Sequence, residues 1–515
     1  MIGTVELGSD QLTGADVVAV ARSGWPVQLT DRAMTAIADA RTAVDRLAAS
    51  ATPVYGVSTG FGALATAHIP ADRRADLQRS LIRSHAASTG REVDREVVRA
   101  LMLLRLRTLT SGRTGVRPET ATALAGLLNA GITPVVGEYG SLGCSGDLAP
   151  LAHVALALMG EGNVRDGGGT ALAADAALAA AGLASVTLAE KEGLALINGT
   201  DGMLGMLLLA IHDLHALLVA ADVSAAMSVE ALLGTDRVFA EDLQALRPHP
   251  GQALSAANIR TLLEDSAIVA SHQIDPADCP IVQDAYSLRC APQVAGAVRD
   301  TVTHAETVAE RELASVIDNP VLLPDGRVES NGNFHGAPVG YVLDFLAVAV
   351  ADLASISERR TDRLLDPARS HGLPPFLAGD PGVDSGHMIA QYAAAGIVSE
   401  LKRLAVPASV DSIPSSAMQE DHVSMGWAAG LKLRRAVDGL RRVIAIEILT
   451  AARALDFRAP LQPAPGTAAA HDAVRNRVQG PGPDRFLAPE LEAVVELLET
   501  GALIAAVEAV TGPLR

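Results

Sequence analysis

The sequence predicts a mainly α-helical protein, in which a long antiparallel helical bundle follows a smaller N-terminal domain. Of the 515 residues, 49% are hydrophobic but only 3% are aromatic, a composition that favours packed helices over β-sandwiches or barrels. Five long segments after Asp201 also carry apolar residues at a spacing of about 3.6 residues. Because a chain of this length exceeds an ordinary single compact domain, we expect two domains, residues 1–200 and residues 201–515.

Helical patterns dominate the N-terminal domain as well. Thr13 to Ala51 is helical in pattern, with Asp10 or Thr13 and then Thr30 or Asp31 as candidate N-caps. After an irregular stretch at 53–62, further helices are expected over 73–87, 94–110, 151–159 and 170–181. The run Arg165-Asp166-Gly167-Gly168-Gly169 predicts a surface turn.

The five long helices are predicted over 202–234, 294–316, 338–364, 387–404 and 422–455. The first contains His212, Asp213 and Glu230, so it is expected to be a buried bundle helix and not a membrane span. One hairpin is expected, with strands over 321–323 and 327–329. The Pro- and Gly-rich segment 458–489 is expected to wrap the surface, before a last helix pair.

Charge and cysteine content exclude several classes of protein. A net charge of -18 disfavours nucleic acid as a partner, because phosphate binding needs a basic face. The N-terminus has no basic region before an apolar core, unlike a secretory signal. Three cysteines, Cys144, Cys279 and Cys290, offer no disulfide framework and no paired metal-ligand spacing. We therefore expect a cytoplasmic protein with neither a metal site nor a membrane partner.

The stretch 140–150, Gly-Ser-Leu-Gly-Cys-Ser-Gly-Asp-Leu-Ala-Pro, precedes an apolar helical segment. Ser145 or Asp147 can cap this helix, and Pro150 fits its first turn. A capped helix start or an anion-binding turn is therefore one interpretation. The other is chemical: if the turn brings the Gly146 nitrogen against the Cys144 carbonyl carbon, the backbone can cyclise, since glycine does not hinder the approach. Loss of the Ser145 hydroxyl as water then leaves a 4-methylidene-imidazol-5-one, a strong electrophile.

Residues Gly140 to His153 resemble the signature of the aromatic amino-acid ammonia-lyases, most closely that of the members that act on histidine. Most of the family has Ala where this chain has Cys144. That residue contributes only its backbone carbonyl, so the resemblance still implies the ring. It also implies the family's helical-bundle fold and a homotetramer in which each active site is lined by several subunits.

Three polar islands in the N-terminal domain match family motifs. Tyr55, in the island 55–62, matches the tyrosine that removes the β-proton, although a loop tyrosine is more often structural. Ser58 stands where most relatives have Asn. His85 matches the position beside the substrate ring, whereas a lone helical His is usually a satisfied core or surface residue. Asn198, locally a candidate helix cap, matches an amide beside the electrophile and the substrate.

A fourth island, 283–293, holds Gln283, Tyr286 and Arg289, which share a face if the segment is helical. The forked guanidinium of Arg289 suits a substrate carboxylate, and an ion pair with Asp284 is the alternative. In the resemblance, Tyr286 steadies the electrophile and the amine together with Asn198, and Gln283 binds the substrate.

Two more islands complete the series. Phe334, in the island 331–336, matches a residue that lines the substrate pocket. Glu420, in the island 415–424, matches the substrate-side carboxylate of the members that act on histidine. Taken alone, Glu420-Asp421-His422 is a helix cap or a metal cluster, and the cap is favoured.

Six islands in the same order imply an enzyme that eliminates ammonia from L-histidine to give trans-urocanate, with the self-made ring as its sole cofactor. The sequence leaves open whether the amine or the imidazole of the substrate reacts with this electrophile. Three alternatives remain: an aminomutase, a tyrosine or phenylalanine ammonia-lyase, and a catalytically silent helical scaffold. His85 and Glu420 disfavour the second alternative, and the intact triplet with Tyr55 and Arg289 disfavours the third.

Overall fold

The computed structural model describes residues 3–8, 12–50, 56, 58–60, 66, 68–272 and 282–515, and it is mainly helical as predicted. The chain divides into two compact units. Unit 1 comprises Met1–His212, Glu306–Asp344 and Pro407–Leu431, and unit 2 comprises Asp213–Ala305, Phe345–Val406 and Lys432–Arg515. The division falls inside four long helices, so each unit is assembled from separated parts of the chain. The expected domain boundary after residue 200 stays a prediction.

Unit 1 combines short helices with small β-sheets. Its helices are α1 (Gly14–Ser23), α2 (Asp31–Ala48), α3 (Arg74–His85), α4 (Arg95–Leu109), α5 (Pro118–Asn129), α6 (Leu148–Leu158), α7 (Ala174–Ala180) and α8 (Glu192–Ile197), with the 3₁₀ turns η2 (Ala71–Arg73) and η5 (Ser416–Met418). Its strands are β1 (Val5–Leu7), β2 (Val27–Leu29), β3 (Thr89–Glu92), β4 (Thr133–Pro134), β5 (Gly137–Tyr139), β6 (Asn163–Arg165), β7 (Ala171–Ala173), β8 (Val321–Leu322) and β9 (Val328–Glu329). β1 and β2 pair in parallel, β3 pairs with β5, β4-β6-β7 form an antiparallel sheet, and β8 and β9 form the predicted hairpin.

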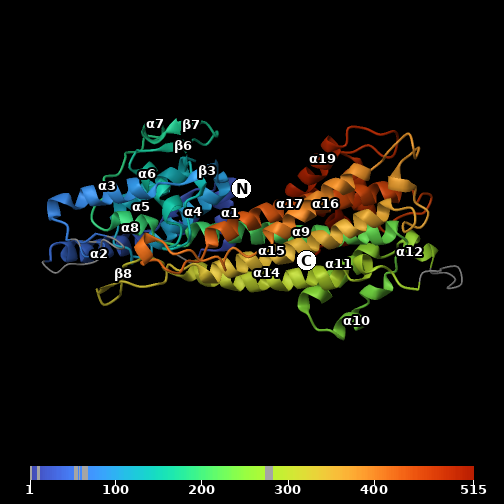
Figure 1. Cartoon of the computed structure of the whole chain (residues 1–515), viewed down its shortest axis with the longest axis horizontal. Helices are drawn as coiled ribbons and strands as arrows, with labels where there is room; N and C mark the ends of the chain where they lie inside the picture. Colours follow the sequence, from blue (N-terminus) through green and yellow to red (C-terminus); the bar gives the residue numbers. More distant parts are fainter. Residues whose placement is uncertain are drawn as a thin grey trace. The chain divides into compact units, whose positions relative to one another are not determined.

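The core of unit 1 forms around α4. This helix buries apolar side chains around most of its circumference, including Leu101, Met102 and Leu103. Helices α1 and α5 pack against it, while α3, α6 and α8 pack on one another (Figure 1). Each fully buried leucine or methionine stabilises the fold by about 1.5–3 kcal/mol, so α4 gives the loops around it a rigid base.

Short-range sequence signals, such as capping side chains and glycines, account for several helix ends in unit 1. Thr13 caps α1 in a capping box with Asp16, and Thr30 caps α2, as predicted. The helical pattern over 13–51 is nevertheless interrupted, because Gly24 ends α1 in a left-handed conformation and β2 follows it. The helix expected over 170–181 begins only at Ala174, since residues 171–173 pair with β6 instead.

The five predicted long helices are all present. They are α9 (Asp201–Ala231), α14 (Ala291–Ala314), α15 (Ala337–Leu365), α16 (Met388–Leu404) and α17 (Gly426–Asp456). α17 begins at Gly426 and not at His422, because Met425 has a left-handed φ of 52°. α9 and α15 are long and apolar enough to cross a membrane, but 78% and 61% of their most apolar windows are buried inside the structure. Such burial is typical of core helices.

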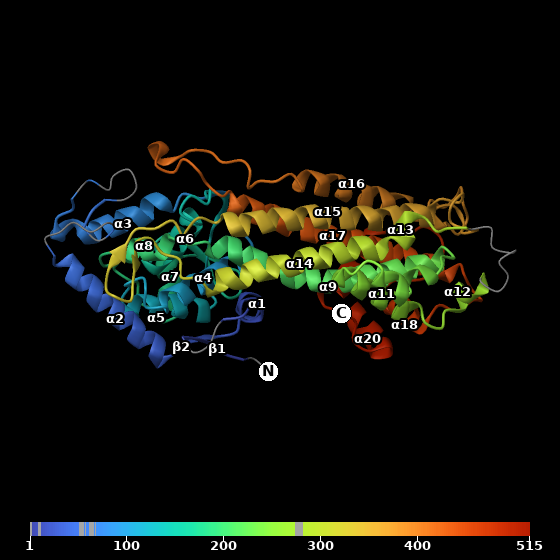
Figure 2. The same cartoon turned by 90° about the horizontal axis from the view of Figure 1, so that it is seen from below.

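Unit 2 contains, besides parts of the long helices, α10 (Glu241–Ala245), α11 (Pro250–Leu263), α12 (Ala267–Ser271), α13 (Tyr286–Arg289), α18 (Pro465–Arg475), α19 (Ala488–Glu499) and α20 (Ala502–Thr511), with η3 (Arg237–Phe239) and η4 (Pro375–Leu377). Ala390 and Ala394 of α16 pack with Ile446 of α17 and with Leu491 of α19. α16 also lies beside α15, to which Gln391 donates a hydrogen bond at Glu358 (Figure 2). The small side chains of Ala390 and Ala394 allow α16 to pack closely against α17.

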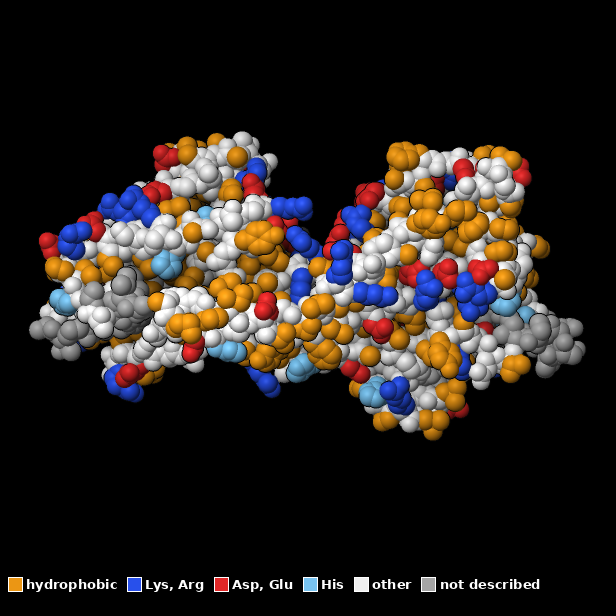
Figure 3. Space-filling view, viewed as in Figure 1, with side chains coloured by type: hydrophobic (Ala, Val, Ile, Leu, Met, Phe, Trp, Pro, Cys, Tyr) orange, Lys and Arg blue, Asp and Glu red, His pale blue; other side chains and the backbone are white. Residues whose placement is uncertain are grey.

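One prediction for unit 2 was wrong. The segment 458–489 does not simply wrap the surface, because it contains α18, which packs against α11 and α20 and buries Ala470 and Val474. On the face drawn in Figure 3, Lys and Arg side chains are interspersed with Asp and Glu side chains within each unit.

Candidate active site

The triplet Cys144-Ser145-Gly146 forms a tight turn between β5 and α6 in unit 1. The backbone of Gly146 forms isolated β-bridges with the backbone of Gly143, Cys144 and Gly199. Gly143 and Gly146 have φ values of 72° and 77°, in the left-handed region that favours glycine. A Cβ atom at Gly146 would overlap the carbonyl group of Gly199. Only glycine therefore fits at this position, next to the backbone of Cys144.

Asp147 caps a different helix from the one predicted. Its side chain makes no capping bond in α6, and Ser145 does not cap α6 either. Instead, Asp147 Oδ2 accepts from the backbone N–H groups of Gly202 and Met203, both at 2.9 Å, at the start of α9. The Ser141 hydroxyl donates to Oδ1 at 3.3 Å. Asp147 is fully buried, and this burial raises its pKa to about 7, although these hydrogen bonds act in the opposite direction.

The raised pKa of Asp147 predicts a specific pH dependence of stability. Between about pH 4 and pH 7 the carboxyl group is protonated in the folded state but ionised in the unfolded state, whose pKa is near 3.8. The unfolded state then binds fewer protons, so the free energy of unfolding falls as the pH rises, by at most about 1.4 kcal/mol per pH unit from this group. Asp147→Asn removes the titrating group. The thermal midpoint of the wild type minus that of the variant should therefore fall as the pH rises from about 4 to about 7, and it should not change further above pH 7. Thermal unfolding followed by circular dichroism measures this, and a difference that stays constant from pH 4.5 to pH 8 would contradict it.

Glu420 of unit 1 lies near both His85 and Cys144, since its charge acts on the pKa of each. Burial lowers the pKa of His85, while its bond to Leu81 and the charge of Glu420 act against this shift. His85 Nδ1 lies 2.9 Å from the Leu81 carbonyl oxygen, which can only accept. Nδ1 of the neutral ring therefore carries the proton, and Nε2 is an acceptor. Burial, followed by the charge of Glu420, raises the pKa of Cys144 to about 12, so its thiol stays protonated.

A strained turn sets the position of Glu420. The residues of η5 have φ values of 52° for Ser416, 54° for Ala417 and 68° for Met418, a region that costs L-residues about 1–2 kcal/mol each. The turn is closed by Ser415, whose N–H donates to the Glu420 carbonyl oxygen at 2.9 Å. The Ser415 hydroxyl donates to Glu420 Oε2 at 3.1 Å. Strain of this kind, held by its surroundings, is often found at functional sites.

The segment after Glu420 connects two other islands. His422 stacks on His335, with ring centroids 5.7 Å apart and ring planes at 6°. The Ser424 hydroxyl donates to the Gly143 carbonyl oxygen at 3.4 Å, and Met425 N–H donates to Leu142 at 3.0 Å. The structure thus brings the islands 331–336 and 415–424 to the triplet turn. Phe334 is partly buried in the loop before α15 and directly precedes His335.

Asn198 lies at the C-terminal end of α8 and is buried. Its amide nitrogen donates to the carbonyl oxygens of Leu194 and Asn319, each at 3.2 Å. Both amide hydrogens are therefore used within the fold, and the amide oxygen is the atom that can accept from a ligand. The side chain does not cap α9, since Asp147 has that role.

The fourth island lies in unit 2, where α13 carries Tyr286 and Arg289. The Arg289 guanidinium lies over the Tyr286 ring, 4.6 Å from its centroid, so these two residues share a face as predicted. Gln283 precedes α13 and is not on that helical face, which corrects the prediction for this residue. Asp284 accepts from Thr235 N–H, and no ion pair joins it to Arg289 in the part of the chain that the structure describes. Arg289 Nε is buried without a partner among these residues.

Part of the predicted site lies outside the described residues. Tyr55 is such a residue. Cys279, which was considered only for disulfide and metal spacing, also lies outside the described residues. Gly56 and Ser58 of the first island are described and buried. Sequence reasoning named no role for Ser141, Ser415 or Ser424. Their positions in the polar stretches 140–150 and 415–424 were the only signal for them. Ser141 and Ser415 bond to groups six and five residues away, whereas the partner of Ser424, Gly143, is distant in sequence.

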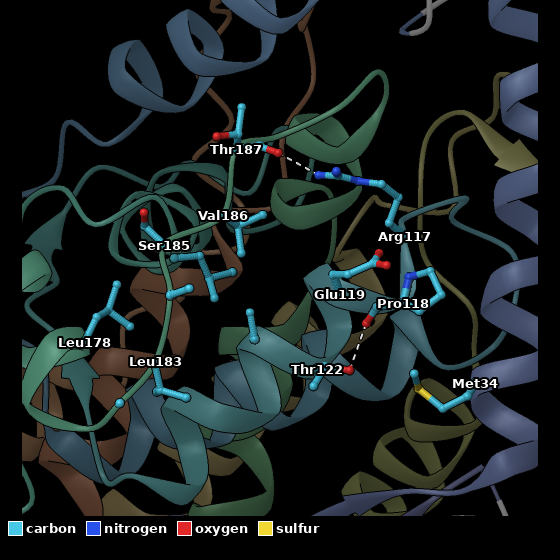
Figure 4. A pocket seen from close by; sticks show the side chains of 14 residues that line it. Met34, Arg117, Pro118, Glu119, Thr122, Leu178, Leu183, Ser185, Val186 and Thr187 are labelled. Atoms are coloured by element: carbon cyan, nitrogen blue, oxygen red, sulfur yellow. Dashed lines mark hydrogen bonds between the residues drawn. The ribbon is translucent and has the colours of Figure 1, made fainter.

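A separate cavity of about 590 Å³ lies in unit 1, between α5 and the segment 182–187 (Figure 4). Arg117 lies at this cavity, where it donates to the Thr187 carbonyl oxygen at 2.6 Å. Its guanidinium also pairs with the buried Glu192 at 2.7 Å. The cation is thus already neutralised, and the cavity contains none of the predicted site residues.

The sequence matches the family described as aromatic amino acid lyase over residues 12–476, and the chain belongs to this family. It is 66% identical to the histidine ammonia-lyase of Streptomyces coelicolor over 99% of this chain and 100% of that protein. It is 65% identical to the histidine ammonia-lyase of Streptomyces avermitilis, covering 99% of both. These relatives confirm the predicted family.

Solved structures confirm the predicted fold class. The tyrosine aminomutase from Streptomyces globisporus matches with a TM-score of 0.94 and 36% identity, covering 100% of both chains. The histidine ammonia-lyase from Trypanosoma cruzi matches with a TM-score of 0.90 and 37% identity, covering 99% of this chain and 96% of that one. The family uses a prosthetic group that is made from its own chain.

Proposed function

We propose that this chain is a histidine ammonia-lyase, which eliminates ammonia from L-histidine to give trans-urocanate. The observation that supports the proposal is that the segment carrying Glu420 is bonded to the triplet turn through Ser424 and Met425, with Glu420 acting on both Cys144 and His85. An imidazole taken out of water needs hydrogen-bonding partners, and the side chains of His85 and Glu420 offer them. The relatives named histidine ammonia-lyase support the same substrate.

The proposed cofactor is 4-methylidene-imidazol-5-one, formed from Cys144, Ser145 and Gly146. The residues present fit this group, because Gly146 is left-handed, lies next to the Cys144 backbone and has no room for a Cβ beside Gly199. The ring supplies an electrophile that makes the substrate nitrogen a better leaving group. No external cofactor is proposed.

The other site residues bind the substrate or move its proton. We assign removal of the β-proton to Tyr55. Arg289 binds the carboxylate through its forked guanidinium, and Asn198 and Tyr286 steady the amine. His85 accepts from the imidazole through Nε2, and Glu420 holds the other side of that ring. Gln283 and Phe334 complete the substrate pocket.

A cytoplasmic homotetramer with shared active sites is proposed for the assembly. In support, α15 and α16 expose large hydrophobic side chains, with Phe345, Ile389 and Tyr392 all more than half exposed. Such surfaces usually mark contacts between proteins. Cys144 and Cys290 are free thiols, as expected in a reducing compartment.

The test is the ultraviolet absorbance of urocanate when the purified protein meets L-histidine, beside parallel samples with L-tyrosine and L-phenylalanine. We expect a rise with L-histidine alone. An intact-mass measurement should show the loss of two water molecules from the chain. A β-amino acid product would instead identify an aminomutase, and a rise with L-tyrosine or L-phenylalanine alone would contradict the substrate assignment.

A further inference from the structure

The segment from Ile317 to Pro320 touches three of the islands in unit 1. The Asn319 carbonyl oxygen accepts from the Asn198 side chain at 3.2 Å. Asn319 Oδ1 accepts from the backbone N–H of Asn331 at 3.1 Å. The backbone of Gly56 approaches Leu194 and Pro320 so closely that an added Cβ atom would clash with their side chains. This short segment therefore contacts the islands that carry Asn198, Phe334 and Gly56.

A fully buried ion pair holds this segment. Lys191 Nζ lies 2.5 Å from Asp318 Oδ2, and both side chains are 0% exposed. The Asp318 carbonyl oxygen also accepts from the Asn331 side chain at 3.0 Å. Lys191 directly precedes α8, the helix that ends at Asn198. The ion pair thus joins the beginning of α8 to the segment that binds the amide at its end.

A second cation supports the same arrangement. Arg105 is completely buried in α4, and it donates to the backbone carbonyl oxygens of Asn198 and Ile317. The backbone of Asn198 is therefore held from α4, while its side chain is held from Asn319. The orientation of the amide depends on where the segment 317–319 lies relative to α8.

Stability alone does not account for this ion pair. Removing two charges from water is costly, and apolar residues of similar volume often stabilise a core as well or better. Lys191 also has a left-handed φ of 69°, which is unfavourable for a residue other than glycine. What the pair does provide is a fixed distance between α8 and Asp318, because neither buried charge can leave its partner.

We propose that Lys191 and Asp318 are positioning residues, which hold the Asn198 amide and the loop at Asn331 in the geometry needed for the reaction. They do not contact the substrate themselves. This inference rests on the proposed function, because Asn198 steadies the substrate amine there.

Asp318→Asn in the full-length protein tests the proposal. We expect kcat for urocanate formation to fall by about 10- to 100-fold, because a small misplacement of a positioned group can cost up to about 100-fold in rate. The intact mass should still show the loss of two water molecules. The matched control is Asp222→Asn in unit 2, which removes a buried carboxylate paired with Arg299 at 2.6 Å. This control should lower the thermal midpoint similarly but leave kcat within about twofold.

A double variant separates positioning from a general structural effect. If Asp318 acts through Asn198, then Asp318→Asn should change kcat little once Asn198→Ala is present. Independent effects that simply add, or an Asp318→Asn protein with the kinetics of the Asp222→Asn control, would overturn the inference.

If Asp318→Asn does not fold, Asn319→Ala leaves both charges in place and removes the side-chain bond to Asn331. It should raise KM for L-histidine, and an unchanged KM would overturn the inference.

These outcomes are distinguishable from failure of the proposed function. Wild-type protein that forms no urocanate would overturn the proposed function and this inference with it. Active wild type with fully active Asp318→Asn would overturn this inference alone.

Discussion

Ser145→Ala should fold like the wild type but lose urocanate formation by more than about 10³-fold, because the hydroxyl that leaves as water during ring formation is absent. Ser145 is only partly buried at the tip of its turn, so removing one oxygen should not disturb the packing. The measurement is urocanate absorbance together with intact mass, and the variant should not show the loss of two waters.

Thr122→Ala is the matched control for loss of a hydroxyl. Thr122 is exposed, and its hydroxyl donates to Pro118 within α5. This variant should retain both the mass change and the turnover. Wild-type turnover by Ser145→Ala would remove the electrophile from the proposed mechanism.

The second large effect is expected on substrate choice. His85→Leu combined with Glu420→Gln should lower kcat/KM for L-histidine by about 10²- to 10⁴-fold, because the buried imidazole then loses its hydrogen-bonding partners. The activity toward L-phenylalanine should not fall in parallel, since a phenyl ring needs no such partners. Steady-state kinetics with L-histidine, L-tyrosine and L-phenylalanine measures this selectivity.

Asp421→Asn is the control for loss of a nearby charge, because Asp421 is exposed and adjacent to Glu420 in sequence. It should leave the selectivity unchanged. The two single variants should show whether His85 and Glu420 act together, since coupled residues give non-additive effects. If the double variant keeps the wild-type preference for L-histidine, these residues do not choose the substrate.

The sequence by itself determined the elements whose signals are local. The apolar spacing predicted α9, α14, α15, α16 and α17, and hydroxyl side chains predicted the caps of α1 and α2. The glycines around Ser145 predicted a tight turn, which the structure confirms. The order of the islands identified the family. Each of these signals depends on residues only a few positions apart, so a linear pattern can report it.

Only the tertiary structure decided which groups meet across long distances in the chain. Asp147 looks like a cap for its own helix, but its carboxylate instead binds the start of α9. Lys191 carries no motif, yet it forms a fully buried ion pair with Asp318. The strained turn before Glu420 and the stacking of His335 on His422 were equally invisible in the sequence. The physical reason is that a buried polar group must find a partner wherever packing brings one, and packing is set by the whole unit rather than by neighbouring residues.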